Sequence, residues 1–332
     1  MRPIRFGIIG TGNIAQRFFA GLTHVPNATV SAVYSRGGAK ARQFAAVHHI
    51  PTVFDEIDDL LASDIDAVYI ATPHPSHAAL SIAALQAGKA VLCEKPAAIS
   101  LTELDAVIAT AQATGRLYME AMKPPFFPLY QLIRERIEAG AIGDVHFVRA
   151  GFANPSVPAG HAVLDPAQAG GGLLDIGIYS AFLAVDWLGA AGEIQTLGRI
   201  GASGVDTFAS LNIQHERGIS QLYCGLDIAG SGEALIGGSA GYVIIHDKWW
   251  NPAKATVVNA LGEREELAIA PQGSGLNYET AHFCDLLRAG ELESPMMSHA
   301  KTRAALAMTL HARDILVTKN VGLVSPLGRN PP

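Results

Sequence analysis

Residues 4–15 read Ile-Arg-Phe-Gly-Ile-Ile-Gly-Thr-Gly-Asn-Ile-Ala, and this stretch decides the fold of the first part of the chain. The apolar run from Phe6 to Ile9 predicts a buried strand, and the periodicity of Ile14–Leu22 predicts a helix directly after it. The small residues of Gly10-x-Gly12-x-x-Ala15 permit a tight turn, a close approach of the backbone to a ligand, and close packing of the helix on the strand. We therefore expect a turn that binds the pyrophosphate of a dinucleotide at the N-terminus of the helix, with an ordinary glycine-rich turn as the alternative.

The composition is typical of a well-buried protein that is large enough for two domains. Its 332 residues are 49% hydrophobic and 16% charged, and its three widely spaced cysteines suggest reduced thiols in the cytoplasm. A net charge of −6 disfavours nucleic acids and anionic membranes as partners. Because the sequence leads directly into a predicted strand, we expect no secretory signal, and no apolar run reaches the roughly 18 residues of a membrane helix. Its 12 histidines lack cysteine or carboxylate at zinc-ligand spacing, so we expect no metal site.

The first 121 residues alternate between strand and helix patterns. After the first strand, five more strand-like runs follow: Thr29–Tyr34, Thr52–Phe54, Asp66–Ala71, Ala90–Cys93 and Leu117–Ala121. Because helical segments separate these runs, the sequence predicts an α/β fold with a doubly wound parallel sheet, a Rossmann domain. Ligands of such a sheet bind at the carboxyl ends of its strands.

The loop after the second run indicates which cofactor binds. An NAD site usually has an acidic residue here, which accepts hydrogen bonds from the adenosine ribose. This chain has Ser35 and Arg36, with Lys40 one turn later. Because arginine can bind a 2′-phosphate through a charge-assisted fork, we expect NADP, with NAD still possible. A solvated surface arginine is the alternative interpretation.

Two further loops should reach the same edge of the sheet. Thr72-Pro73-His74-Pro75-Ser76-His77 follows the fourth run, and Glu94-Lys95-Pro96 follows the fifth. His74 and His77 could contact the cofactor or substrate, or serve the structure alone. The residues that we expect to contact the cofactor are Gly10, Thr11, Gly12, Asn13, Ile14, Ser35, Arg36, Lys40, Thr72, Pro73, His77, Glu94 and Lys95.

The pattern changes after Met122, and we place a domain boundary at the rigid segment Lys123-Pro124-Pro125. Residues 1–122 would bind the cofactor, and residues 123–332 would bind the substrate. Strand patterns follow one another almost without helices from Ile194 to Ile269, which predicts an α+β domain with a large, mostly antiparallel open sheet. The other segments expected here are the helices Phe126–Ala139, Gly170–Leu188, Tyr278–Ala289 and Ser298–Thr318, the strand Val145–Ala153 and an irregular loop over residues 154–169.

A possible proton-transfer site follows a glycine run in this second part. Gly170-Gly171-Gly172 precedes Asp175 and Tyr179, which are four residues apart and so share one face of a helix. The glycines would leave room for a ligand to approach the backbone. The pKa of a free tyrosine is near 10, and a nearby Lys95 would lower it by favouring the phenolate. The alternative is that Tyr179 packs in the core and that Asp175 only places a negative charge in the first turn of the helix.

Three motifs together resemble the signatures of the Gfo/Idh/MocA oxidoreductase family. They are Gly10-x-Gly12-x-x-Ala15, Glu94-Lys95-Pro96 and the segment from Gly170 to Tyr179, in the family's order and approximate spacing. The ending from Asn277 to Pro295 is also similar to the family. Many members have histidine where this chain has Tyr179, so it is most similar to the branch of dimeric dihydrodiol dehydrogenases and NADP-dependent D-xylose dehydrogenases.

The resemblance implies a dehydrogenase that acts on the CH–OH group of a sugar, such as D-xylose, or of a cyclic trans-diol. It implies that Tyr179 is the general acid/base, that Lys95 binds the reacting oxygen and tunes Tyr179, and that Asp175 orients substrate hydroxyls. It also implies a homodimer, or a higher homo-oligomer, through the exposed face of the second sheet. One departure is that Lys123-Pro124-Pro125 stands where relatives often carry an aromatic residue and a substrate-contacting arginine. A redox-neutral sugar enzyme with tightly bound NAD(P) and a non-catalytic NADP-binding regulator remain as alternatives.

Overall fold

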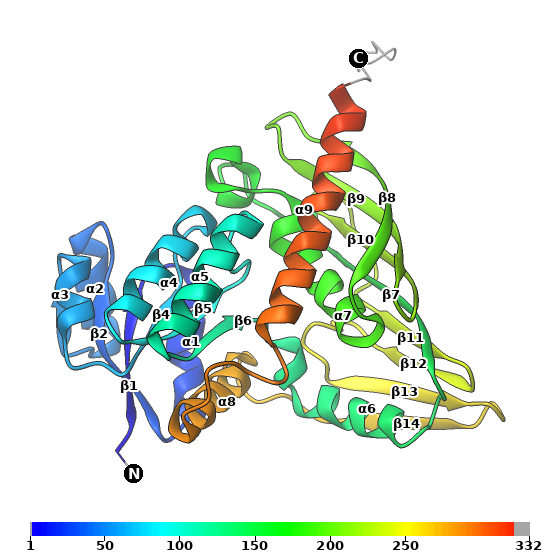
Figure 1. Ribbon diagram of the computed structural model, residues 1–332, viewed down its shortest axis with the longest axis horizontal. Coiled ribbons are helices and arrows are strands. Elements are labelled where there is room, and N and C mark those ends of the chain that lie inside the picture. Colours follow the sequence, from blue (N-terminus) through cyan, green and yellow to red (C-terminus); the bar gives the residue numbers. More distant parts are fainter. Residues whose placement is uncertain (1, 322–332) are drawn as a thin grey trace.

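The computed structural model describes residues 2–321, and two β-sheets lie side by side in it (Figure 1). The long helix α9 (His299–Val321) runs between them and contacts both parts of the molecule. Residues 322–332, the end of the expected substrate-binding part, lie outside the described residues.

Six parallel strands form the first sheet in the order β3-β2-β1-β4-β5-β6. The strands are β1 (Ile4–Ile9), β2 (Ala28–Tyr34), β3 (Thr52–Phe54), β4 (Ala67–Ile70), β5 (Ala90–Glu94) and β6 (Tyr118–Ala121). The helices between them are α1 (Asn13–Gly21), α2 (Gly38–His48), α3 (Ile57–Ala62), α4 (His77–Gln86) and α5 (Leu101–Thr114). This confirms the doubly wound parallel sheet. The chain reverses its direction of travel across the sheet at β1, which has β2 on one side and β4 on the other, and such a switch point forms a ligand crevice.

Eight strands form the second sheet in the order β14-β13-β12-β11-β7-β10-β9-β8. They are β7 (Val145–Ala153), β8 (Ala191–Ile200), β9 (Asp206–His215), β10 (Gly218–Gly225), β11 (Ala234–Gly238), β12 (Gly241–Ile245), β13 (Lys254–Asn259) and β14 (Arg264–Ala268). Only β7 and β10 pair in parallel, so the expected mostly antiparallel sheet is confirmed. Edge strand β14 was not singled out in the sequence because its Arg-Glu-Glu run lacks an apolar alternation.

Helices cover one face of this second sheet. They are α6 (Pro128–Glu138), α7 (Ile178–Leu188) and the C-terminal part of α9. Residues of β9 alternate between buried and exposed, so every second side chain of that strand faces outward. The segment Pro166–Leu188, which contains α7, is long and apolar enough to cross a membrane, but 94% of its most apolar window is buried inside the protein. It is a core segment of this fold.

A helix from the end of the chain completes the first sheet. Helix α8 (Leu276–Ala289) packs against α1, and the Phe283 ring lies 5.8 Å from the ring of Phe6 in β1. The ring of Phe18, on α1, lies 5.5 Å from the same Phe6 ring and stacks on Tyr69 at 3.7 Å. One face of the first sheet is therefore packed by residues that are more than 250 positions apart in the chain.

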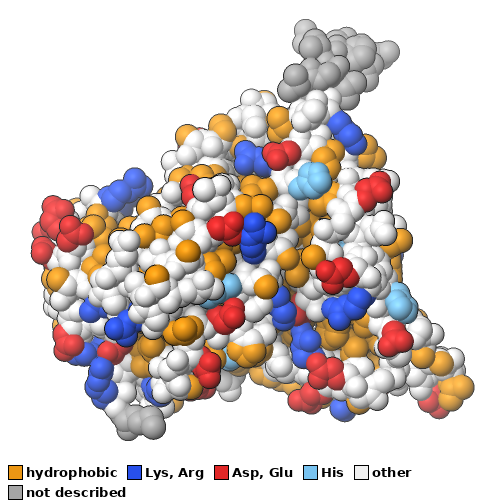
Figure 2. All heavy atoms as spheres, viewed as in Figure 1, with side chains coloured by type: hydrophobic (Ala, Val, Ile, Leu, Met, Phe, Trp, Pro, Cys, Tyr) orange, Lys and Arg blue, Asp and Glu red, His pale blue; other side chains and the backbone are white. Residues whose placement is uncertain are grey.

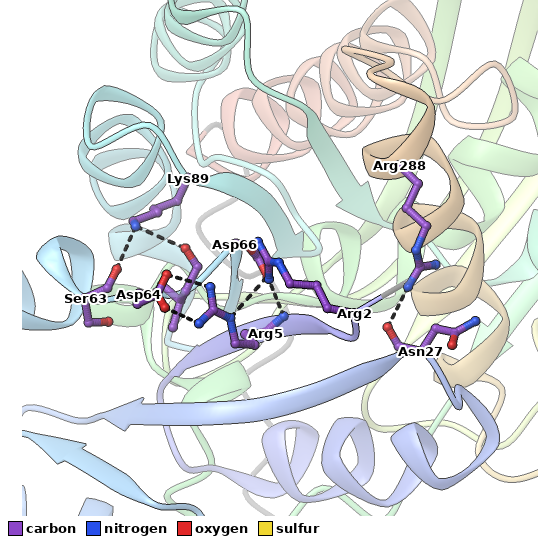
Figure 3. Close-up of polar contacts among 9 residues, drawn as sticks. Arg2, Arg5, Asn27, Ser63, Asp64, Asp66, Lys89 and Arg288 are labelled. Carbon is purple, nitrogen blue, oxygen red and sulfur yellow. Dashed lines mark hydrogen bonds and ion pairs between the residues drawn. The ribbon is translucent and has the colours of Figure 1, made fainter.

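Ion pairs fix the amino-terminal edge of the first sheet, opposite the crevice (Figure 3). The Arg2 guanidinium donates to both carboxylate oxygens of Asp66 at 2.6 and 2.7 Å, and Arg5 pairs with Asp64. Arg288 of α8 donates to the Asn27 carbonyl at 2.6 Å. These exposed contacts set the position of β1, and each such pair contributes about 0–1 kcal/mol to stability.

Charged side chains of both signs are interspersed with apolar ones over the face shown in Figure 2. This distribution suits a chain with 24 basic and 30 acidic residues. The three cysteines, Cys93, Cys224 and Cys284, are buried and form no disulfide, as expected from their spacing.

Candidate active site

The glycine-rich turn after β1 has the shape that a pyrophosphate needs. Gly10 has φ +103°, and a β-carbon there would collide with the Ala71 carbonyl oxygen, so only glycine fits the turn. A β-carbon on Gly12 would meet nothing within 4 Å, which leaves open space in front of the α1 N-terminus. Within residues 2–321 no side chain caps that terminus, so its N–H groups are free to bind an anion. The residues present therefore fit a dinucleotide, and Thr11, Asn13 and Ile14 lie partly or fully exposed around this space.

The loop after β2 presents two exposed cations. Arg36 and Lys40 are exposed and Ser35 is half-buried. Arg36 forms no hydrogen bond or ion pair with the residues that the structure describes, so its guanidinium is available to a ligand. Arg42, one turn further along α2, instead pairs with Asp55 at 2.8 Å.

The structure brings Lys95, Asp175 and Tyr179 together. The Lys95 ammonium donates to the Asp175 carbonyl oxygen at 2.6 Å and to its carboxylate at 2.8 Å. The same ammonium lies 5.2 Å from the centre of the Tyr179 ring. Lys95 directly follows β5, whereas Asp175 lies in the segment that leads into α7 and Tyr179 in the first turn of α7. The two sheets therefore meet at this site.

The electrostatics of this group differ in one respect from the expectation. Burial lowers the pKa of Lys95, but Asp175 and Tyr179 outweigh burial and raise it, so Lys95 stays charged. Burial raises the pKa of Asp175, but Lys95 reverses the shift, so Asp175 is ionised. The lowering effect that we expected of Lys95 on the pKa of Tyr179 is present, but it does not decide the net shift. The Tyr179 side chain is only 8% exposed, and burial raises the pKa of the phenol above its usual value even though Lys95 opposes the shift.

We expected the glycine run to leave room for a ligand, but it does not. A β-carbon on Gly170 would collide with the Val163 carbonyl, and one on Gly171 would collide with the Asp206 carboxylate. The protein's own atoms thus fill the space beside these glycines. The segment Leu173–Gly177 that follows is wound as a single π-helical turn rather than as the start of a regular α-helix. Such turns are rare, and many of them lie at functional sites.

The histidine loop after β4 supports the site without presenting His77 to a cofactor. The His77 ring is 1% exposed, and its two nitrogens lie 2.7 Å from the Thr72 carbonyl and 2.8 Å from the Pro96 carbonyl. The expected direct cofactor contact of His77 is therefore wrong, because the ring is enclosed between the two loops that it holds. Thr72 is half-buried and Pro73 exposed. Burial lowers the pKa of His74 to about 4, so His74 is neutral beside Asp175 and Lys95.

A buried charge cluster behind the crevice was not foreseen. Glu94 is 6% exposed and accepts a hydrogen bond from the Tyr69 hydroxyl. Glu279 of α8 is fully buried, and neither of its carboxylate oxygens has a hydrogen-bond partner among residues 2–321. Burial and Glu94 raise the pKa of Glu279 well above its usual value. Burial and Arg17 lower the pKa of Lys123 to about 8. The sequence indicates this cluster only through charged residues in apolar surroundings, as in Ala-Met-Lys123-Pro-Pro.

Aromatic side chains form a wall beside Tyr179. The ring of Phe152, at the end of β7, lies 6.1 Å from the Tyr179 ring and stacks at 3.7 Å on the ring of Trp250. Trp249 anchors this loop by donating its indole N–H to the Gly151 carbonyl at 2.8 Å. Phe152 and Trp250 are both half-buried, so part of each ring remains accessible.

Comparison with known proteins gives the family. A family model described as an oxidoreductase family with an NAD-binding Rossmann fold matches residues 4–122, and the model of the GFO/IDH/MocA C-terminal domain matches residues 130–244. The chain belongs to the Gfo/Idh/MocA oxidoreductase family. The resemblance seen in the three motifs is thereby confirmed.

Two curated relatives of this Gfo/Idh/MocA protein are dihydrodiol dehydrogenases by name. The protein is 33% identical to trans-1,2-dihydrobenzene-1,2-diol dehydrogenase of Bos taurus over 97% of this chain and 98% of the relative. The enzyme of that name from Mus musculus is 34% identical over 97% and 98%. Among solved structures, a 3-ketoreductase from Actinomadura kijaniata in complex with NADP and TDP-benzene is 25% identical, with a TM-score of 0.81 over 96% of this chain and 98% of that one. Levoglucosan dehydrogenase with NADH and levoglucosan shares the fold, with a TM-score of 0.86 at 19% identity over 96% and 98%.

These findings make the protein a nicotinamide-dependent dehydrogenase or reductase that acts on CH–OH groups. The matches cover nearly the whole of each relative, so both parts of the chain have counterparts in them.

Proposed function

We propose that this oxidoreductase transfers a hydride between NADP and a hydroxyl-bearing carbon of a cyclic trans-diol, or of a sugar such as D-xylose. The observation that carries the proposal is the convergence of Lys95 and Tyr179 in front of the Phe152–Trp250 wall. The stacked rings favour a planar, unsaturated ring over a sugar, because aromatic faces pack well on such rings. The name of the curated relatives supports the same substrate class.

The chain's own residues supply the proton chemistry. A lysine ammonium has three N–H donors, and Asp175 accepts two of those of Lys95, so the third can donate to the reacting oxygen. The Tyr179 hydroxyl would give a proton to that oxygen in reduction and accept one in oxidation. When bound, the nicotinamide supplies or accepts the hydride. Gly10, Gly12 and the free N–H groups of α1 would hold the pyrophosphate of the cofactor. Thr72 and Pro73 would border its nicotinamide half, with the buried Glu94 behind them.

The experiment for this function is cofactor reduction by the purified protein, with NADP or NAD, across cyclic trans-diols, aldoses and polyols. We expect turnover with NADP, fastest with an unsaturated cyclic trans-diol. Turnover confined to aldoses would contradict the substrate preference drawn from the aromatic wall. Cofactor binding without turnover of any substrate would contradict the proposed function and favour a redox-neutral or regulatory role.

Arg36 should set the preference for NADP. Replacing Arg36 with Ala removes the guanidinium that would bind the 2′-phosphate, and we expect the Kd for NADPH to rise by about 10- to 100-fold while the Kd for NADH stays unchanged. The matched control is Arg42→Ala, an exposed arginine of the same region that already pairs with Asp55. Fluorescence titration of reduced cofactor measures both constants. An equal loss for NADPH and NADH would refute the assignment of Arg36.

We further propose a homodimer in the cytoplasm, with residues 1–122 binding the cofactor and residues 123–332 binding the substrate. The outward face of the second sheet supports such an assembly, because Leu197 of β8 and Ile219 of β10 are 72% and 53% exposed. A depression of about 450 Å³ lies on that sheet, bordered by Arg149, Tyr223 and Glu233. Buried free thiols support the cytoplasmic location.

A further inference from the structure

Asp206, the first residue of β9, occupies a buried position at the start of the π-helical turn. Its side chain accepts a hydrogen bond from the Leu173 N–H at 2.6 Å, and the residue is 1% exposed. Gly172, which precedes the turn, has no side chain to make this bond. The first N–H of the turn is thus satisfied by a carboxylate that lies 33 positions further along the chain.

The glycine run is shaped around this carboxylate. Gly171 has φ +123°, and a β-carbon there would collide with Asp206 Oδ1. Oδ1 itself is buried and has no hydrogen-bond partner in the described part of the chain. The far end of the turn is packed as closely, because a β-carbon on Gly177 would lie 3.2 Å from the Cys224 sulfur of β10. The second sheet therefore fixes both ends of the turn.

Asp175 lies in this turn and Tyr179 lies just after it, so the position of the turn also determines the positions of these two residues. Leu173 lies two residues before Asp175, whose carbonyl and carboxylate accept hydrogen bonds from Lys95. Tyr179 lies four residues after Asp175. We propose that Asp206 is a positioning residue, whose carboxylate sets where Asp175 holds Lys95 and where Tyr179 presents its hydroxyl. This inference rests on the proposed function of Lys95 and Tyr179.

The charge of Asp206 is kept at a cost to stability. Burial raises the pKa of Asp206 to about 6, against the opposing effects of the Leu173 N–H and of Arg313 on α9. The other titratable groups on this side are Cys224, whose thiol pKa burial raises, and Asp175, whose pKa Lys95 lowers. The pKa of the Asp206 carboxyl is higher in the folded than in the unfolded chain. Folding stability therefore falls as the pH rises from the ordinary pKa of an aspartate to about 6.

The test compares Asp206→Asn, which keeps the shape and removes the charge, with Asp206→Ala. At pH 8, we expect Asp206→Asn to raise the Tm while lowering kcat about tenfold, and Asp206→Ala to lower kcat by about 100-fold, both with an unchanged cofactor Kd. In the reduction direction, wild-type kcat should fall as the pH drops through about 6, and Asp206→Asn should lack this limb. The matched control is Asp165→Asn, an exposed carboxylate that accepts the Ala167 N–H at 2.9 Å and should leave kcat unchanged.

Hydrogen–deuterium exchange of the peptide that spans residues 170–179 reports on the contact between Asp206 and the Leu173 N–H, and it needs no substrate. We expect faster exchange in Asp206→Ala than in the wild type and in Asp165→Asn. Wild-type kcat in Asp206→Asn, a parallel loss of Tm and kcat in that variant, or unchanged exchange in Asp206→Ala would overturn the proposal. If the wild type turns over none of the tested substrates but exchange still depends on Asp206, the proposed function fails while the anchoring of the turn stands.

Discussion

Replacing Tyr179 with Phe is expected to lower kcat by about 10²- to 10⁴-fold, the usual contribution of a general acid/base, while the Kd for the cofactor hardly changes. The reason is that Phe keeps the ring beside Lys95 and Phe152 but removes the only hydroxyl of the group. Steady-state kinetics and cofactor titration of the same preparation measure the two effects. An equal loss of turnover and of cofactor binding would refute the role of Tyr179.

The pH dependence provides a second measurement on Tyr179. Because burial raises the pKa of its phenol, the phenolate that accepts a proton in oxidation is scarce at neutral pH. Oxidation should therefore accelerate by about tenfold per pH unit in the alkaline range, whereas reduction, which uses the phenol, should not. A rate of oxidation that is flat above neutral pH would show that another group takes the proton.

Lys95→Met is expected to cause a loss of kcat of the same order, because it removes the donor to the reacting oxygen and leaves the Asp175 carboxylate without its cation. The matched control is Lys89→Met. Lys89 is also partly buried and donates to two carbonyls, those of Ser63 and Ile65, but it lies at the opposite edge of the first sheet (Figure 3). Comparable losses of kcat in both variants would indicate general disruption rather than a role at the site.

The largest expected effect on stability is at Asp186, in α7. Its carboxylate is completely buried and binds the Tyr130 hydroxyl at 2.6 Å, the Lys301 ammonium at 2.7 Å and the Arg134 guanidinium. This joins α6, α7 and α9. Asp186→Ala removes the buried anion shared by Lys301 and Arg134 and leaves Arg134 only the more distant Glu138, at 3.7 Å, so we expect the free energy of unfolding to fall by about 3–5 kcal/mol. Denaturation in urea measures the change.

The matched control for this prediction is Asp105→Ala. Asp105 also pairs with a cation of α9, Arg303, at 2.7 Å, but both side chains are about half exposed. Solvent screens such a pair, so the loss should stay below about 1 kcal/mol. Similar losses in the two variants would contradict the argument that burial makes the Asp186 network important.

Local sequence patterns were sufficient to predict the architecture. The strand, turn and helix around Gly10 and Gly12 involve contacts between near neighbours, and alternation over the first 121 residues determines a parallel sheet by general rules of connection. Lys95, Asp175 and Tyr179 could be named because the motifs of the family carry them. That they meet through hydrogen bonds of 2.6 and 2.8 Å could be seen only in the structure.

Features that depend on distant parts of the chain were missed or misread. The glycines before Asp175 were interpreted as space for a ligand, whereas Asp206 fills that space. The pKa of Tyr179 was expected to be low because Lys95 could be anticipated, but the burial that outweighs it could not. Glu279 and Lys123 gave almost no local signal, since their buried environment is assembled from α1, β5 and α8. Long-range burial is a property of the packed chain and leaves little trace in a short window of sequence.

The packing of Phe283 on Phe6 has a consequence for how the protein is made. During synthesis on the ribosome, the first sheet is complete once β6 has emerged, but the hydrophobic surface around Phe6 stays uncovered until α8 follows more than 150 residues later. The nascent chain must therefore hold an exposed apolar surface while the whole second sheet is translated. This interval is when a chaperone would bind most readily, and a chain released early would be prone to aggregate.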